Sequence, residues 1–238
     1  MVSLIPVTWD VKATLIERPN RFLAIAQRKD GEGLAPLKIH VRDPGRLEEL
    51  LFPGNELLIR HATNAARKTA WDLIAARFKK EWVLVNSGFH SVITETILTN
   101  PLICPFGPPI YLKREVKYGK SRLDFLISTQ EDEKIYIEVK GCTLARNSVA
   151  LFPDAPTKRG KRHLQELMAI CQRGMRAAVI FLVFRSDSTV FMANRETDPE
   201  FANTLHEAFS IGVEIYPVLL EYRDNFIWYK SIIPITFF

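Results

Sequence analysis

The sequence predicts an α/β domain with a mixed central sheet flanked by helices, preceded by a small all-β barrel. Up to about residue 85, short apolar runs are separated by Pro, Gly, Asn and charged clusters, whereas helix and strand patterns alternate from about residue 86 onward. The chain has 238 residues, of which 47% are hydrophobic, so it is long enough for two modest domains. We therefore expect domains at residues 1–85 and 86–238.

The N-terminal region reads as a series of brief strands divided by turn residues. A small all-β module of this kind is typical of a five-stranded barrel of the OB type. The expected strands lie within residues 11–19, 21–33, 37–41, 55–62, 69–78 and 81–86. Between them, RDPGRLEELLFPG predicts a turn, a short helix from Arg46 to Leu51, and a second turn at Pro53 and Gly54.

The C-terminal region predicts the order helix, three strands, helix, strand, helix, strand. The first helix ends at Asn100, because a residue before proline is disfavoured in the α region. The run AAVIFLVF is typical of a strand covered on both faces, and Asp198 followed by Pro199 marks a helix start. The expected helices lie within residues 91–100, 157–174 and 198–212, and the strands within 111–119, 121–128, 134–145, 177–184 and 213–222.

The segment YIEVKG places Glu138 and Lys140 on one face of a strand, since residues two apart share a face. Asp124 lies on the preceding strand, and a hairpin can bring it to the same end of the sheet. Two carboxylates suit Mg²⁺ or Mn²⁺, and an adjacent amine can orient water or stabilise developing charge. Glu95 on the preceding helix is a possible third ligand. The alternative is a solvated strand face with a cross-strand ion pair.

Asp124 followed by Glu138-Val139-Lys140, in this order of elements, resembles the PD-(D/E)XK nuclease superfamily. Leu123 stands where that superfamily usually has proline. The runs EVKYGKSRLDFLI, YIEVKGCTL and VALFPDAPTKRGKRHLQELM resemble the sugar fermentation stimulation protein A family. The resemblance implies an OB-like N-terminal domain, a PD-(D/E)XK nuclease-like α/β domain, and non-specific DNA binding with a regulatory role in sugar metabolism.

Cations gather where a helix is expected to begin, at TKRGKRH, although the helix dipole disfavours positive charge there. The arrangement is sensible if a phosphate group docks at that helix start. The alternative for the TKRGKRH segment is a solvated basic surface, and for His163 it is a hydrogen-bonded structural histidine. For the cations of the first strand hairpin, the alternative is a salt-bridged rim of the sheet. The expected nucleic-acid contacts are Lys158, Arg159, Lys161, Arg162 and His163, then Lys117, Lys120 and Arg122, and in the N-terminal module Arg42 and Arg46.

Two functions from different classes fit these observations. The first is a Mg²⁺- or Mn²⁺-dependent deoxyribonuclease, and the second is a non-catalytic, non-specific DNA-binding regulatory protein. RNA binding led by the barrel is a third alternative. A net charge of +5 fits a polyanionic partner without requiring one.

Cellular setting and assembly are constrained more weakly by the sequence. With no long apolar run and no signal-like N-terminus, we expect a cytoplasmic protein without a membrane partner. The three cysteines show no CxxC spacing, which indicates buried free thiols. The oligomeric state stays open, with a homodimer as one alternative.

Overall fold

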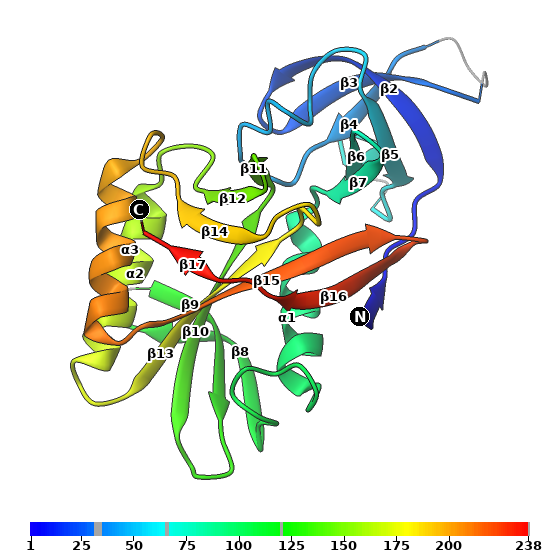
Figure 1. Ribbon diagram of the computed structural model, residues 1–238. Helices are drawn as coiled ribbons and strands as arrows, with labels where there is room; N and C mark the ends of the chain where they lie inside the picture. Colours follow the sequence, from blue (N-terminus) through cyan, green and yellow to red (C-terminus); the bar gives the residue numbers. More distant parts are fainter. Residues whose placement is uncertain (31–34, 65–66, 120, 238) are drawn as a thin grey trace. The chain divides into compact units, whose positions relative to one another are not determined.

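The computed structural model describes residues 1–30, 35–64, 67–119 and 121–237 (Figure 1). The chain divides into two compact units, Met1–Phe89 with Glu221–Tyr229, and His90–Leu220 with Lys230–Phe238. Strands β15 (Glu214–Arg223) and β16 (Phe226–Ile232) contribute residues to both units. The expected domain limits at residues 85 and 86 stay a prediction.

The first unit contains the predicted five-stranded barrel, which is closed. Its strand order is β4-β3-β2-β5-β6, and a parallel pairing of β4 with β6, at Ile39 and Trp71, completes the ring. Small and branched residues such as Ala13, Ala24 and Leu57 fill the interior. The barrel strands are β2 (Val11–Asn20), β3 (Leu23–Arg28), β4 (Leu37–His40), β5 (Glu56–His61) and β6 (Trp71–Phe78).

Two further strands and one short helix belong to the same unit. Strand β7 (Glu81–Leu84) pairs with β6, and a 3-10 helix follows at Ser87–Phe89. Strand β1 (Val2–Pro6), which the sequence analysis did not anticipate, pairs with the Phe226–Tyr229 part of β16.

The expected short helix from Arg46 to Leu51 is wrong. Leu47 has a φ of 52°, which a right-handed helix cannot accommodate, and its carbonyl accepts hydrogen bonds from the backbone N–H groups of Leu50 and Leu51. The segment therefore forms tight turns. All three leucines are buried, so burial of their side chains overrides the local helix preference.

The second unit is built on a mixed sheet with the strand order β15-β13-β10-β9-β8, as the predicted fold class requires. Strands β10, β13 and β15 are parallel, whereas β9 and β8 run antiparallel to their neighbours. Helix α1 lies on one side of this sheet, and α2 and α3 lie together on the other (Figure 1). The bounds are β8 (Tyr111–Tyr118), β9 (Ser121–Ser128), β10 (Lys134–Cys142), β13 (Arg176–Val183), α1 (His90–Thr99), α2 (Lys158–Cys171) and α3 (Pro199–Ile211).

A second, smaller sheet of order β11-β12-β14-β17 was not predicted. Its strands are β11 (Leu144–Arg146), β12 (Val149–Phe152), β14 (Val190–Ala193) and β17 (Ile235–Thr236). Each has four residues or fewer, too short to produce a recognisable alternation. Ala150, Phe191 and Ala193 of this sheet join the core under α2 and α3.

Asp198 fixes the starts of both α2 and α3. As predicted, it caps α3, since its Oδ1 accepts the backbone N–H of Phe201 at 2.9 Å. Its Oδ2 accepts the N–H of Thr157 at 2.8 Å, and Thr157 is itself the N-cap of α2. One buried carboxylate thus holds the beginning of α2 next to the beginning of α3.

The cysteines match the expected buried free thiols only in part. All three cysteines are free thiols, but only Cys142 is fully buried, while Cys104 and Cys171 are partly exposed. Among the described residues, no helix is both long and apolar enough to cross a membrane.

Replacing Asp198 with alanine should lower the free energy of unfolding by about 1–3 kcal/mol, because two backbone N–H groups lose their acceptor. Urea denaturation monitored by circular dichroism measures the change. Glu207→Ala, on the exposed side of α3, is the matched control and should shift stability by less than about 0.5 kcal/mol. Equal effects of the two substitutions would contradict the capping role.

Candidate functional site

The site forms where strands β9 and β10 separate. Their antiparallel pairing ends at Phe125 and Ile137. Two residues beyond Ile137, the backbone N–H of Val139 donates to Asp124 Oδ2 at 2.7 Å, so a side chain takes over the role of the strand partner. Asp124 and Glu138 are the first residues beyond the last pair, and their carboxylates therefore come close together.

Glu138 is the most constrained member of the site. It is only 3% exposed, and its Oε1 accepts hydrogen bonds from Lys140 Nζ and from His163 Nδ1. Its second oxygen, Oε2, is buried and has no hydrogen-bond partner in the described part of the chain. A buried carboxylate oxygen without a partner is costly, and a ligand at this position would remove that cost.

The two carboxylates differ in their electrostatic environment. Burial, followed by the nearby charge of Glu138, raises the pKa of Asp124 to about 6, against the opposing hydrogen bond from Val139. Burial would also raise the pKa of Glu138, but the His163 hydrogen bond and the charge of Lys140 together hold it below its ordinary value. Two adjacent acids with separated pKa values are typical of functional sites.

His163 reaches this site from the first turns of α2. The residue is 2% exposed, and its Nε2 accepts a hydrogen bond of 3.4 Å from Arg159 Nε, one turn earlier. Since Arg159 can only donate, His163 carries its proton on Nδ1 and donates it to Glu138. From the sequence we expected His163 to contact nucleic acid. The i, i+4 spacing of Arg159 and His163 could have suggested that these two side chains interact. It gave no sign of the contact between His163 and Glu138.

The carboxylate pair suits a hard divalent cation. Mg²⁺, Mn²⁺ and Ca²⁺ prefer oxygen ligands, and Mg²⁺ commonly takes one or two carboxylates while keeping several waters. Glu138 Oε2 and the free oxygen of Asp124 are the ligands that the protein could offer. Within the residues described, no three Asp, Glu, His or Cys side chains form a metal-binding group.

Glu95 does not join this pair. Its carboxylate lies on α1 and forms an ion pair with Arg114 of β8. Helix α1 covers the face of the sheet opposite to α2, whereas Glu138 faces α2 through His163. Sequence spacing could not reveal this, because it does not state which face of the sheet a helix will cover.

His90 braces the strand beyond the site. A Cβ atom on Gly141 would overlap the His90 ring, which also stacks on Phe184 with centroids 5.4 Å apart. Burial, and then the charge of Lys140, lower the pKa of His90 to about 4. The ring is therefore neutral at pH 7, and only glycine permits its approach to β10 next to Lys140.

The cations at the start of α2 differ in their contacts. Lys158 and Arg162 are exposed and have no partner among the described residues, whereas Lys161 forms an ion pair with Glu200 of α3. The Thr157 side chain caps the helix by accepting the N–H of Gly160 at 3.0 Å. Lys158 and Arg162 therefore lie at a helix start where the N–H of Gly160 already donates to the Thr157 side chain.

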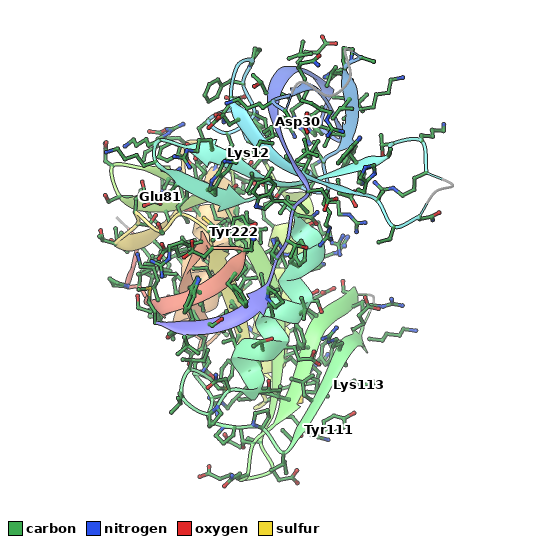
Figure 2. All side chains as sticks on the ribbon, turned by 90° about the vertical axis from the view of Figure 1, so that its right-hand side faces the viewer. Lys12, Asp30, Glu81, Tyr111, Lys113 and Tyr222 are labelled. Carbon is green, nitrogen blue, oxygen red and sulfur yellow. The ribbon has the colours of Figure 1, made fainter. Side chains whose placement is uncertain are left out.

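The second basic group lies on the edge of the main sheet. Strand β8 ends the sheet, and Lys113 and Tyr111 extend outward from it (Figure 2). Lys117 is exposed opposite Arg122 of β9, and Arg122 forms an ion pair of 3.0 Å with Glu115. Lys120 lies outside the described residues.

The N-terminal cations belong to the barrel unit. Arg42 lies 3.7 Å from Asp72, a buried acid that also receives two hydrogen bonds from Arg67, and Arg46 is exposed. Burial would raise the pKa of Asp72, but the Arg67 hydrogen bonds and the Arg42 charge outweigh it and lower that pKa. Arg42 therefore forms an ion pair with Asp72, whereas the Arg46 side chain forms no ion pair with the described residues.

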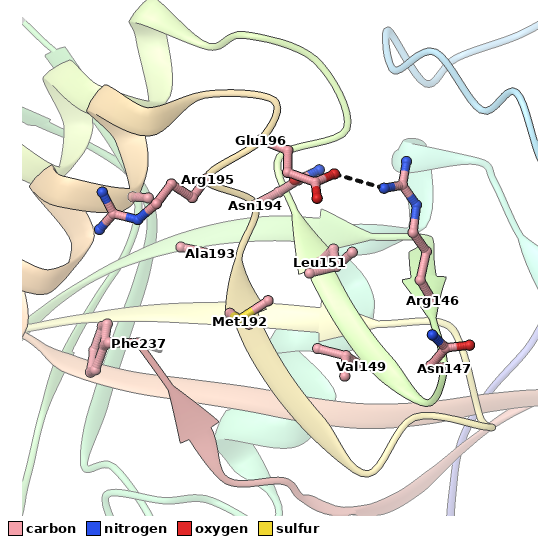
Figure 3. Close-up of a pocket in the computed structure, with 11 residues that line it drawn as sticks. Arg146, Asn147, Val149, Leu151, Met192, Ala193, Asn194, Arg195, Glu196 and Phe237 are labelled. Carbon is pink, nitrogen blue, oxygen red and sulfur yellow. Dashed lines mark hydrogen bonds and ion pairs between the residues drawn. The ribbon is translucent and has the colours of Figure 1, made fainter.

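A separate pocket of about 460 Å³ lies over the small sheet (Figure 3). Its lining includes the apolar side chains of Val149, Leu151, Met192 and Phe237, with the 3.0 Å ion pair of Arg146 and Glu196 at its rim. The residues lining it do not include Asp124, Glu138 or Lys140. The pocket is thus distinct from the carboxylate pair.

Two family models match the chain. Residues 16–85 match the SfsA N-terminal OB domain, and residues 88–226 match the sugar fermentation stimulation protein RE domain. The first match covers the closed barrel except for the first half of β2, and the second includes Asp124, Glu138, Lys140 and His163.

Similar proteins cover nearly the whole chain. A sugar fermentation stimulation protein homolog from Methanococcoides burtonii is 43% identical over 96% of this chain and 93% of its own length, and one from Methanothermobacter thermautotrophicus is 46% identical over 94% and 91%. The solved structure of Pyrococcus furiosus SfsA in complex with Ca²⁺ matches with a TM-score of 0.88 and 26% identity, over 99% of this chain and 100% of that chain. The chain therefore belongs to the sugar fermentation stimulation protein family, SfsA.

Proposed function

We propose that the protein binds DNA and hydrolyses its phosphodiester bonds with the help of Mg²⁺ or Mn²⁺. The observation that carries this proposal is the buried oxygen of Glu138, which has no described partner and lies near the carboxylate of Asp124, whose pKa is raised. A cation between the two would relieve both the missing contact and the repulsion. The Ca²⁺ complex of the P. furiosus relative supports a divalent cation in this family.

Each side chain then has a role in the reaction. Asp124 and Glu138 hold the cation, which would supply activation of water and neutralise charge on the phosphate. Lys140, hydrogen-bonded to Glu138, lies within reach of the same space and stabilises negative charge that develops as the bond breaks. Val139 fixes Asp124 through its N–H, which keeps one carboxylate oxygen aimed away from the cation.

Contacts to the nucleic-acid backbone fall to the exposed cations of the second unit. Lys158 and Arg162 are free at the start of α2, on the helix that also supplies His163 to the site. Lys117 and Arg122 on the sheet edge would add further phosphate contacts. The OB barrel supports the same class of partner, since OB folds commonly bind single strands.

A second candidate function is non-catalytic DNA binding, with a regulatory link to sugar metabolism. One observation favours it: both Lys140 and His163 are engaged with the same oxygen of Glu138, so Lys140 is not free in this conformation. The link to sugar is carried by the names of the relatives. Both functions predict DNA binding, and only the first predicts cleavage.

The wild-type protein should nick plasmid DNA with Mg²⁺ or Mn²⁺ and lose this activity in EDTA. Asp124→Ala, Glu138→Ala and Lys140→Ala should each lower the cleavage rate by at least about 100-fold, because each removes a cation ligand or a charge-stabilising group. Gel electrophoresis of supercoiled plasmid measures the rate, and a gel shift at low salt measures binding, which should survive.

Glu131→Ala, on the exposed turn before β10, is the matched control and should leave the cleavage rate unchanged. Persistent nicking in Asp124→Ala and Glu138→Ala would refute the enzymatic proposal. Binding without cleavage by the wild-type protein would favour the regulatory function. Preference for RNA over DNA of one sequence would point to the third alternative.

Asp124→Asn should stabilise the metal-free protein by about 1–3 kcal/mol at pH 7 but not near pH 4. Between its usual pKa of 3.8 and about 6, folded Asp124 holds a proton that the unfolded chain releases, so wild-type stability falls as pH rises through this window. Asparagine can still accept the Val139 N–H without the charge. Urea unfolding at several pH values tests this, with the exposed Asp132→Asn as control.

Lys158→Ala combined with Arg162→Ala should weaken DNA binding for every sequence and make its salt dependence shallower. Each lost phosphate contact reduces the slope of log K against log salt by about 0.9 for duplex DNA, so the pair should reduce it by about 1.8. Lys134→Ala, at the opposite end of β10 from Lys140, is the control. An unchanged slope in the double variant would exclude this helix start as a phosphate contact.

A further inference from the structure

His163 is placed to act on the cation site through Glu138. Its ring is buried, with 2% of its surface exposed, and its Nδ1–H donates to Glu138 Oε1. Lys140 donates to the same oxygen from the neighbouring position of β10. Two donors from two elements, a strand and a helix, therefore fix one oxygen of the carboxylate and leave Oε2 without a described partner.

Arg159 completes this chain of contacts on the solvent side. Its Nε donates to His163 Nε2 at 3.4 Å, which holds the ring in the tautomer that can donate to Glu138. The guanidinium group itself is exposed at the start of α2. A cation at the helix surface is thus connected to the buried carboxylate through one imidazole.

We propose that His163 is a positioning residue that aims Glu138 Oε2 at the divalent cation, and that Arg159 supports it by holding the His163 ring. This inference rests on the proposed function, because it assigns a role toward the cation of that same site. Histidine and carboxylate orientation by outer hydrogen bonds typically changes metal affinity by about 10–100-fold.

Titration with Mn²⁺ in an isothermal calorimeter, at a temperature well below unfolding, measures cation affinity. It therefore tests the positioning role of His163 without any DNA cleavage. His163→Leu should weaken Mn²⁺ binding at least about 10-fold, because it keeps the volume but removes the donor. His163→Asn places an amide N–H near the position of Nδ1 and should bind Mn²⁺ within about threefold of the wild type. Leu167→Val, one turn further along α2 in the core, should destabilise the fold yet keep the affinity.

A pair of surface variants covers the case in which His163→Leu does not fold. Arg159→Met and Lys158→Met each remove one positive charge from the same helix turn, and simple electrostatics predicts tighter cation binding for both. The positioning role predicts instead that Arg159→Met weakens Mn²⁺ binding by about threefold, whereas Lys158→Met does not.

The outcomes separate this inference from the proposed function. Wild-type affinity in folded His163→Leu, or tighter binding by Arg159→Met, would overturn the positioning role alone. Equal weakening by His163→Asn and His163→Leu would do the same, because the hydrogen bond would not be the cause. If the wild-type protein binds no Mn²⁺, both the proposed function and the inference fail.

Discussion

The candidate site depends on one hydrogen bond, from the backbone N–H of Val139 to the carboxylate of Asp124. It replaces the next rung of the β9–β10 ladder, which ends at Phe125 and Ile137, while β10 stays paired with β13 as far as Cys142. Strand β9 thus separates from β10 but stays paired with β8, while β10 continues beside β13. Because the first residues after the last rung are both acids, the fold brings two negative charges together at a place where a regular sheet would set backbone against backbone.

The elements around this opening are held by helix capping and close packing. The N-cap of helix α2 is Thr157, whose N–H donates to Asp198, and the same helix carries His163 to Glu138. On the opposite face, His90 packs against the backbone at Gly141, directly after Lys140. The carboxylates therefore cannot move apart to relieve their repulsion without disturbing elements that are themselves capped or packed. Such preorganisation is what a binding site for a small hard cation requires.

The sequence predicted the repeating and capped parts of this protein well. The strand alternation around Glu138 and Lys140, the Asp198 cap and the barrel strands all follow from local patterns that the fold obeys. The missed parts depend on partners distant in sequence. The small sheet consists of strands too short to carry a pattern, Leu47 turns the chain because its side chain is buried, and Glu95 pairs with Arg114 because α1 covers the other face. The contact of His163 with Glu138, 25 residues apart, belongs to the same class.

The residues of this site lower the stability of the free protein. A protein selected only for stability would not bury Glu138 with an oxygen that has no described partner, next to an aspartate whose pKa is raised to about 6. Replacing Asp124 or Glu138 by a neutral residue would remove the repulsion between them. The cations at the start of α2 would be more stable at the C-terminal end of a helix, where the helix dipole favours positive charge. Both features disfavour the free protein, and under the proposed function a bound divalent cation and a phosphate would offset them. The interactions that lower the stability of the free protein therefore involve the groups that the proposed metal-assisted phosphodiesterase would need. Functional sites commonly contain interactions that lower stability.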